Sequence, residues 1–317
     1  MTAITRAVGQ SGRRYVVERL LQEKPGPLGR VYLVSFGSQQ NVLKSVPQND
    51  FKSFQDMFSD LQGSSNIRVA DDAIPDQSMF AYRYFRGHLL SFAQTNPPLL
   101  ITKQILRDSL RGIAALHEKG IVHSDIKANN IMLEFTNDET DGNVTVSRVQ
   151  IAEDAAYVPD DSAIVARRVG NWTWRSPEAH ASRKVQKPSD IFSFGIVCIY
   201  ALTKRVIFAV EKEELEDGCV EELAIVLERQ LSYFADLESL DGLLQYLGDS
   251  PLVQLFTIIA NGFDEEHPRA PIALWKDIDP DFKDLIGKMT NIGPKRRITA
   301  HEALAHRWFA DVTYQGL

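Results

Sequence analysis

Hydrophobic residues in the first third of the chain occur in short runs separated by glycine and proline. Runs at residues 15–17, 31–34, 42–46 and 79–84 have the length and composition of β-strands bounded by turns. Over residues 51–61, apolar side chains instead recur three and four positions apart, which places them on one face of a helix. The pattern therefore predicts a small antiparallel sheet accompanied by one helix.

The later part of the chain has the pattern of helices. An apolar stripe over residues 105–114 is followed by a lysine and a glycine at 119–120, which are typical of a helix end. Most of residues 189–309 is also helical by pattern. The most apolar segment, 191–210, is interrupted by charged and hydroxyl side chains and falls short of the roughly 18 apolar residues of a bilayer span. It predicts a buried core helix.

Two short apolar runs interrupt this helical part. They lie at residues 131–133 and 149–151 and predict two strands. The polar segment between them, at 136–143, is expected to be a solvated hairpin tip.

These elements together predict the α+β fold class, with a small β-rich lobe joined to a larger, mainly helical lobe. A chain of 317 residues is long enough for two such units. The expected boundaries are an N-terminal tail at 1–14, the first lobe at 15–86, the second lobe at 87–312 and a C-terminal tail at 313–317.

The composition is that of a folded soluble protein, with 44% hydrophobic and 24% charged residues. A net charge of -7 argues against nucleic acid or a membrane surface as a main partner. No apolar stretch of signal-peptide length follows the arginines near the N-terminus. The cysteines, Cys198 and Cys219, are expected to be buried or free thiols in a reducing compartment. We therefore expect a cytoplasmic or nuclear protein.

Three chemically distinct side chains lie close together between two short apolar stretches: Asp125, Lys127 and Asn130. Phosphoryl transfer needs a carboxylate to orient the attacking hydroxyl, a cation beside the moving phosphoryl group and an amide oxygen to hold a metal ion. These three residue types could fill those roles. The same spacing also fits an ordinary polar turn between a helix and a strand, so this segment alone leaves both interpretations open.

Several segments resemble parts of the eukaryotic protein kinase family, in the order in which that family has them. Gly26, Gly29 and Val31 resemble the glycine-rich loop, where missing side chains let backbone N–H groups approach the phosphates of ATP. Taken alone, this segment is equally well a turn between two strands. Lys44, on the following predicted strand, resembles the lysine that contacts the α- and β-phosphates.

The C-terminal half carries further segments that resemble the same family. Glu178 resembles the end of an activation segment, and Asp190 resembles the start of the long central helix. In the family, a glutamate like Glu178 pairs with an arginine like Arg297, and an aspartate like Asp190 braces the backbone of the catalytic loop. The position of Lys127 is similar to that in the serine/threonine branch. The resemblance covers about residues 15–310.

The resemblance implies a bilobal protein-kinase fold with ATP and Mg²⁺ as cofactors. It implies transfer of a phosphoryl group to a serine or threonine hydroxyl of an unidentified protein substrate. The residues that it assigns to catalysis are Asp125, Lys127 and Asn130. Those that it assigns to nucleotide binding are Gly26, Gly29, Val31 and Lys44.

The metal-binding motif departs from the family. Where protein kinases have Asp-Phe-Gly, this chain has Ala-Glu-Asp-Ala-Ala at residues 152–156. One alignment places Glu153 at the metal-binding aspartate, and a shift by one residue places Asp154 there. Either carboxylate, together with Asn130, could bind Mg²⁺. Neither alignment restores the apolar phenylalanine, so the packing that locks the active arrangement is expected to be lost.

Other positions also depart from the family. Lys24 stands where the first glycine of the loop is expected, and Ser124 replaces the arginine that binds an activation-loop phosphate. Only Gln55 or Asp56 could replace the helix glutamate that pairs with the strand lysine. Two hypotheses follow. The chain is a serine/threonine protein kinase with weak activity, or it is a pseudokinase that acts as a nucleotide-binding or purely protein-binding scaffold.

The segment before Glu178 shows one more substitution. Asn171 stands where the serine/threonine branch has a threonine, and its amide can still form hydrogen bonds. Trp172 and Trp174 are expected to pack against the protein interior rather than to form a platform for substrate.

Overall fold

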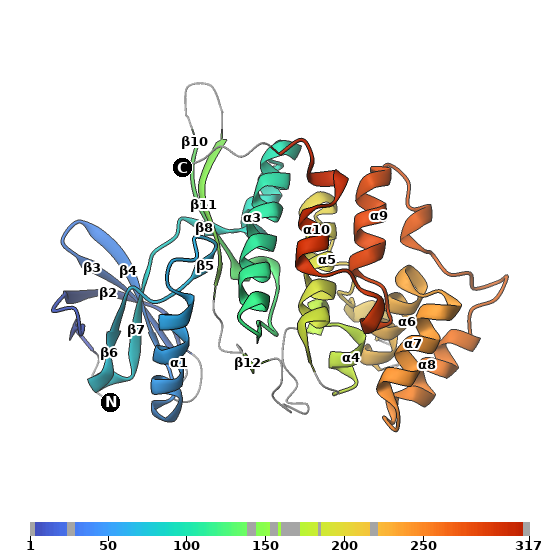
Figure 1. The fold of residues 1–317 in the computed structure, drawn as a ribbon, viewed down its shortest axis with the longest axis horizontal. Coiled ribbons are helices and arrows are strands. Elements are labelled where there is room, and N and C mark those ends of the chain that lie inside the picture. The colour runs from blue at the N-terminus through green and yellow to red at the C-terminus, as the bar shows by residue number, and fades with distance from the viewer. Residues whose placement is uncertain are drawn as a thin grey trace. The chain divides into compact units, whose positions relative to one another are not determined.

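The computed structural model describes residues 4–23, 29–137, 144–152, 158–159, 172–182, 185–215 and 221–312. The chain divides into two compact units, Met1–Arg86 and Gly87–Leu317. Among the described residues, the first unit consists of a sheet with one helix, whereas the second is mainly helical (Figure 1). The predicted α+β fold class is confirmed.

The first unit is built on a six-stranded sheet in which every neighbouring pair is antiparallel. The strand order is β1-β2-β3-β4-β7-β6. The strands of this unit are β1 (Arg6–Val8), β2 (Arg14–Glu23), β3 (Arg30–Phe36), β4 (Gln39–Ser45), β5 (Ile67–Arg68), β6 (Asp72–Ile74) and β7 (Met79–Arg83). The four runs predicted as strands correspond to β2, β3, β4 and β7.

Helix α1 (Gln48–Leu61) packs through its predicted apolar face. Phe51 and Phe58 are buried against Phe80 of β7, with ring centroids 4.5 and 5.1 Å from that of Phe80. The first contact is stacked and the second is edge-to-face, the arrangements that aromatic rings prefer. These rings hold α1 against the sheet.

The segment expected to be an N-terminal tail contributes β1 and the turn after it. Asp72 of β6 binds this turn, because its carboxylate accepts the backbone N–H of Ser11 at 3.1 Å and also the Ser11 hydroxyl. The Tyr15 hydroxyl donates to the same carboxylate at 3.1 Å. A Cβ atom on Gly9 would lie 1.9 Å from Asp72 Oδ2, so this close approach requires glycine.

The second unit contains most of the helices. They are α2 (Leu89–Phe92), α3 (Leu99–Glu118), α4 (Pro177–His180), α5 (Lys187–Thr203), α6 (Glu222–Phe234), α7 (Leu237–Leu247), α8 (Leu252–Asn261), α9 (Pro280–Met289) and α10 (Ala300–Leu304). Its strands are β8 (Gly87–His88), β9 (Ile121–Val122), β10 (Ile131–Asn137), β11 (Val144–Ala152) and β12 (Val158–Pro159). Strand β10 pairs with β8 and β11, and β9 pairs with β12, all antiparallel.

Strands β10 and β11 are longer than predicted. They include Thr136 and Asn137 on one side and begin at Val144 on the other, so the first two residues of the expected hairpin tip belong to a strand. Thr136 lies opposite Thr145, and β-branched pairs of this kind favour strand pairing although they are polar. The rest of the expected hairpin tip, 138–143, lies outside the described residues.

Helix α5 forms the centre of the second unit and packs against α3 and α9 (Figure 1). Every residue from 189 to 201 is buried, which confirms a buried core helix, but α5 ends at Thr203, so residues 204–210 of the predicted segment are not helical. Cys198 is a free cysteine within it, and burial raises the pKa of its thiol, so it stays protonated and unreactive. Cys219 lies outside the described residues. Within the described part of the chain, no helix is both long enough and apolar enough to cross a membrane.

A buried ion pair joins two distant segments of the second unit. Arg297 Nη2 donates to Glu178 Oε2 at 2.8 Å, and Nη1 donates to Oε1. The other guanidinium N–H groups donate to the backbone carbonyls of Pro188, Asn291 and Ile292. Because every donor is used and both side chains are at most 2% exposed, the pair is fully satisfied without water. The expected pairing of Glu178 with Arg297 is confirmed.

His180 ends α4 in an apolar and aromatic environment. Neither of its ring nitrogens has a hydrogen-bond partner among the described residues, and its ring lies edge-on to Trp172 with centroids 5.2 Å apart. Burial, and then the charge of Arg175, lower the pKa of His180 from 6.5 to about 3. The folded chain therefore keeps this imidazole neutral well into the acidic range.

The Arg297 pair yields a stability prediction. Arg297→Met leaves Glu178 as a buried carboxylate without its cation, so we expect the free energy of unfolding to fall by about 3–5 kcal/mol. Urea unfolding would measure it. Arg296→Met is a matched control, because the pair of Arg296 with Glu238 is 43% and 77% exposed and is expected to contribute less than about 1 kcal/mol. Equal losses in the two variants would contradict a special role for the buried pair.

His180 yields a pH prediction. In the unfolded chain its imidazole binds a proton below about pH 6.5, whereas the folded chain holds it neutral down to about pH 3. Acid therefore favours the unfolded state, and this one group should remove about 2 kcal/mol of stability between pH 7 and pH 5. His180→Phe keeps a ring against Trp172 and abolishes the titration. Between pH 7 and pH 5, the unfolding free energy of this variant should fall by about 2 kcal/mol less than that of the parent protein. An equal fall in both proteins would show that His180 is not held neutral in the folded chain.

Candidate functional site: the loop after β9

The residues expected to perform phosphoryl transfer lie on a loop between β9 and β10 in the second unit. A short 3₁₀ turn, Ala128–Asn130, ends this loop and leads directly into β10. Apolar neighbours fix both ends, because Val122, Ile126 and Ile131 are all buried. The loop therefore presents its polar side chains from a rigid base.

The structure brings Asp125, Lys127 and Asn130 together. Lys127 Nζ donates to Asp125 Oδ2 at 2.6 Å, and Asn130 Nδ2 donates to the same oxygen at 3.2 Å. Asn130 Nδ2 also donates to the Asp125 carbonyl at 2.9 Å. The side chains of Asp125 and Lys127 are each only 12% exposed, so their charges are weakly screened by water. This arrangement fixes a carboxylate, a cation and an amide within one small volume.

Asp190, in the first turn of α5, anchors the loop through its backbone. Its carboxylate accepts the backbone N–H groups of His123 and Ser124, both at 2.8 Å. His117, in the last turn of α3, contacts the same carboxylate through Nε2 at 3.0 Å. Asp190 is only 1% exposed, and hydrogen bonds to a buried carboxylate are strong. The expected bracing of the loop backbone by Asp190 is confirmed.

Ser124, which stands where the family has arginine, has a left-handed backbone with φ of 61°. Such a conformation is uncommon for residues other than glycine and requires support from its surroundings. The hydrogen bond from its N–H to Asp190 provides that support and directs the chain into Asp125.

His123 connects the loop to the end of strand β11. Its Nδ1 accepts the backbone N–H of Asp125 at 3.2 Å, and its Nε2 lies 2.9 Å from the carbonyl oxygen of Ala152. Since Nδ1 accepts, Nε2 must carry the proton and donate it to Ala152. The imidazole thus holds this loop against the last residue before Glu153 and Asp154, the two candidate metal ligands.

Those two carboxylates, and Gly26 of the glycine-rich segment, lie outside the described residues. Within the described part of the chain, no group of three or more His, Cys, Asp or Glu side chains is placed to hold a metal ion. Asn130 is therefore the one metal-ligand candidate from the sequence whose geometry is described.

The other nucleotide-binding candidates lie in the first unit. Gly29 is buried directly before β3, and Val31 of β3 lies opposite Lys44 of β4 in the antiparallel register. Strand pairing therefore sets Lys44 beside the end of the predicted glycine-rich segment.

The two candidate partners of Lys44 on α1 have other partners in the same unit. Gln55 Nε2 donates to Gln10 Oε1 at 2.9 Å. Asp56 accepts from Lys52 Nζ at 2.7 Å in an exposed pair one helical turn apart. The uncharged Gln55 is held by the N-terminal turn, and Asp56 faces solvent.

The segment before Glu178 packs as expected. Trp174 is 5% exposed and meets Tyr200 of α5 edge-on, with ring centroids 5.7 Å apart. Trp172 packs against the ring of His180. Both tryptophans therefore contribute to the interior, and Asn171 lies outside the described residues.

Two histidines of the site were missed by reasoning from the sequence. His117 and His123 each touch a group that positions the loop, yet neither stood out among seven histidines. Their positions gave a usable signal. His117 lies at the end of the predicted helix, and His123 lies two residues before Asp125.

Known proteins resemble this chain at moderate identity. The serine/threonine-protein kinase ste20 of Emericella nidulans is 26% identical over 205 residues, which are 64% of this chain and 18% of that relative. The serine/threonine-protein kinase pakA of Talaromyces marneffei is 25% identical over 64% of this chain and 23% of its own length. The CaM kinase-like vesicle-associated protein of Xenopus laevis is 21% identical over 95% of this chain and 64% of that relative. The chain thus spans less than a quarter of the length of the first two.

The family comparison covers most of the chain. A model of the protein kinase domain matches residues 75–309. The match begins directly after β6, so it includes the catalytic loop, Asp190 and Arg297, whereas Lys44 lies before it. With the buried Glu178 pair and the Asp190 anchor in place, the chain belongs to the protein kinase family.

Proposed function

We propose that this protein transfers the γ-phosphoryl group of ATP to serine or threonine hydroxyls of a protein substrate. The observation that supports it best is the cluster of Asp125, Lys127 and Asn130 on a loop anchored by Asp190. In this proposal Asp125 orients the attacking hydroxyl, and Lys127 stabilises negative charge on the moving phosphoryl group. The position of Lys127 favours hydroxyls of serine and threonine.

The orientation of the Asn130 side chain suits it to bind a metal ion. Its amide nitrogen donates to Asp125, which turns the amide oxygen, the atom that Mg²⁺ would require, to the other side. In the proposal Asn130 and either Glu153 or Asp154 hold Mg²⁺, which supplies positive charge against the phosphate oxygens. Gly26, Gly29, Val31 and Lys44 would bind the nucleotide.

A pseudokinase is the second candidate function. It is favoured by the sequence of α1, which has no glutamate and offers only the uncharged Gln55 and the exposed Asp56 in place of the family's helix glutamate. Such a protein would act through its surface, with or without bound nucleotide, on an unidentified protein partner. Under either function we place the protein inside the cell, in the cytoplasm or nucleus.

The catalytic proposal predicts the effect of Asp125→Asn on phosphotransfer. The amide cannot orient and accept the hydroxyl proton, so transfer to a mixed serine and threonine peptide library should fall roughly 100-fold or more. Binding of ATP should change less than about threefold, since Asp125 acts on the acceptor. Asp60→Asn, an exposed substitution on α1, is the matched control. If the parent protein transfers phosphate no faster than Asp125→Asn does, the result would favour the pseudokinase.

Nucleotide binding is tested separately with Lys44→Met. Loss of one cation from the phosphates should weaken Mg²⁺-dependent ATP binding roughly tenfold, measured by calorimetry on the full chain. Lys52→Met removes a nearby exposed lysine of the same unit and should leave the affinity unchanged. Equal affinities of the two variants would exclude Lys44 from the nucleotide site. Binding that does not respond to Mg²⁺ would exclude Glu153 and Asp154 as working metal ligands.

A further inference from the structure

The N-terminal turn, residues 9–12, is fixed to β6 at the edge of the first sheet. The Gln10 N–H donates to the carbonyl oxygen of Ala73 at 2.8 Å, and the Ser11 N–H donates to the carboxylate of Asp72 at 3.1 Å. Two consecutive residues of the turn are thus bonded to two consecutive residues of one strand. The backbone that carries the Gln10 side chain therefore has a fixed place on the sheet.

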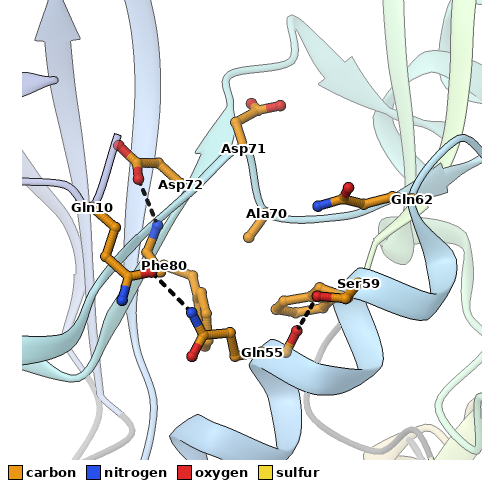
Figure 2. Close-up of a pocket in the computed structure, with 10 residues that line it drawn as sticks. Gln10, Gln55, Ser59, Gln62, Ala70, Asp71, Asp72 and Phe80 are labelled. Carbon is orange, nitrogen blue, oxygen red and sulfur yellow. Dashed lines mark hydrogen bonds between the residues drawn. The ribbon is translucent and has the colours of Figure 1, made fainter. Parts of the chain in front are cut away.

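The Gln10 side chain extends from this turn to helix α1. Gln55 Nε2 of α1 donates to Gln10 Oε1 at 2.9 Å. Figure 2 shows this hydrogen bond running from α1 to the turn, beside a hollow of about 170 Å³ that both elements line. A tightly packed interface resists displacement, whereas a hollow of this size leaves α1 room to shift toward β6. The Gln10 hydrogen bond opposes that shift.

Helix α1 depends on such contacts for its position. It has 14 residues, and no side-chain hydrogen bond caps its start at Pro47. An isolated helix of that length is only marginally stable, so contacts with the rest of the unit determine where it lies. Its buried residues, Phe51, Phe58 and Leu61, form a narrow stripe. Gln55 lies one helical turn from both Phe51 and Phe58, so a hydrogen bond at Gln55 also restrains the two rings.

These rings connect α1 to Lys44. The ring centroids of Phe51 and Phe58 lie 4.5 and 5.1 Å from that of Phe80, which is buried. Phe80 of β7 lies directly opposite Lys44 of β4 in the antiparallel register. Residues paired in this way project from the same face of a sheet, with Cβ atoms about 5 Å apart. A displacement of α1 that moves the Phe80 ring therefore changes the packing beside the Lys44 side chain.

We propose that the N-terminal turn is a strap that sets the position of α1 and, through α1 and Phe80, the position of Lys44. Gln10 and Gln55 are positioning residues in this arrangement, and neither is assigned to nucleotide. The consequence for ATP rests on the proposed function, in which Lys44 binds the phosphates. The turn itself lies before residues 75–309, the part of the chain that the protein kinase model matches.

The first test measures hydrogen exchange of the α1 backbone amides in the full chain. Gln10→Met keeps the size of the side chain and removes the acceptor oxygen, so exchange should become at least about threefold faster. Gln55→Met should have a similar effect, and the double variant should exchange no faster than either single variant, because both remove the same hydrogen bond. Gln40→Met is the matched control. It removes an exposed glutamine bond to Glu18 at 3.5 Å, which does not involve α1, and should leave the exchange unchanged.

The second test follows Lys44 directly. In protein labelled with ¹³C at the lysine Cε, the Lys44 signal, identified by its loss in Lys44→Met, should shift in Gln10→Met and stay in place in Gln40→Met. This measurement needs no nucleotide. With ATP and Mg²⁺ present, Gln10→Met should raise the dissociation constant about threefold, and that effect should disappear when Lys44 is already methionine.

Each possible result decides the proposal. Unchanged exchange of α1 in Gln10→Met, or equal acceleration by Gln40→Met, would overturn the strap. Faster exchange with an unmoved Lys44 signal would also overturn it, because the turn would then stabilise α1 without affecting the lysine. If exchange and the Lys44 signal change as expected but the parent protein binds no ATP, the strap is supported and the proposed phosphotransfer is refuted. Gln10 and Gln40 are exposed, so their variants are expected to fold.

Discussion

The conformation of the loop that carries Asp125, Lys127 and Asn130 depends on the carboxylate of Asp190. Its two oxygens accept consecutive backbone N–H groups, and one of these hydrogen bonds supports the left-handed backbone of Ser124. The position of Asp190 in the first turn of α5 adds a favourable interaction with the helix N-terminus. Because α5 is buried along most of its length, the loop takes its rigidity from the core of the second unit.

The elements with a strong hydrophobic period could be predicted from the sequence. The face of α1, the buried helix α5 and four strands of the first sheet follow from spacing alone, and the resemblance to protein kinases supplied the partners Glu178 and Arg297. The contacts of Asp72 with Tyr15 and Ser11 could not be predicted, because these residues lie 57 and 61 positions away and the contacts have no periodic signal. The role of His123 was hidden for a similar reason, since its partner Ala152 is a backbone carbonyl that any residue would provide.

The residues that make the chain recognisable as a kinase are not all evidence of catalysis. Glu178, Arg297 and Asp190 are buried and saturated with hydrogen bonds, so selection for a stable fold is enough to keep them. Lys127 and Asn130 differ, because their side chains donate to Asp125. The catalytic interpretation is supported mainly by Lys127 and Asn130, which lie on a loop with a strained backbone at Ser124.

The Asp72 contacts also determine where the folded first unit begins. A chain shortened to start at Tyr15 would keep the sheet strands that the hydrophobic pattern reveals, yet it would lose both donors of Ser11. The Tyr15 hydroxyl and the Ala73 N–H would be the remaining donors to this carboxylate. The residues before the first predicted strand are therefore part of the folded unit, which starts no later than β1.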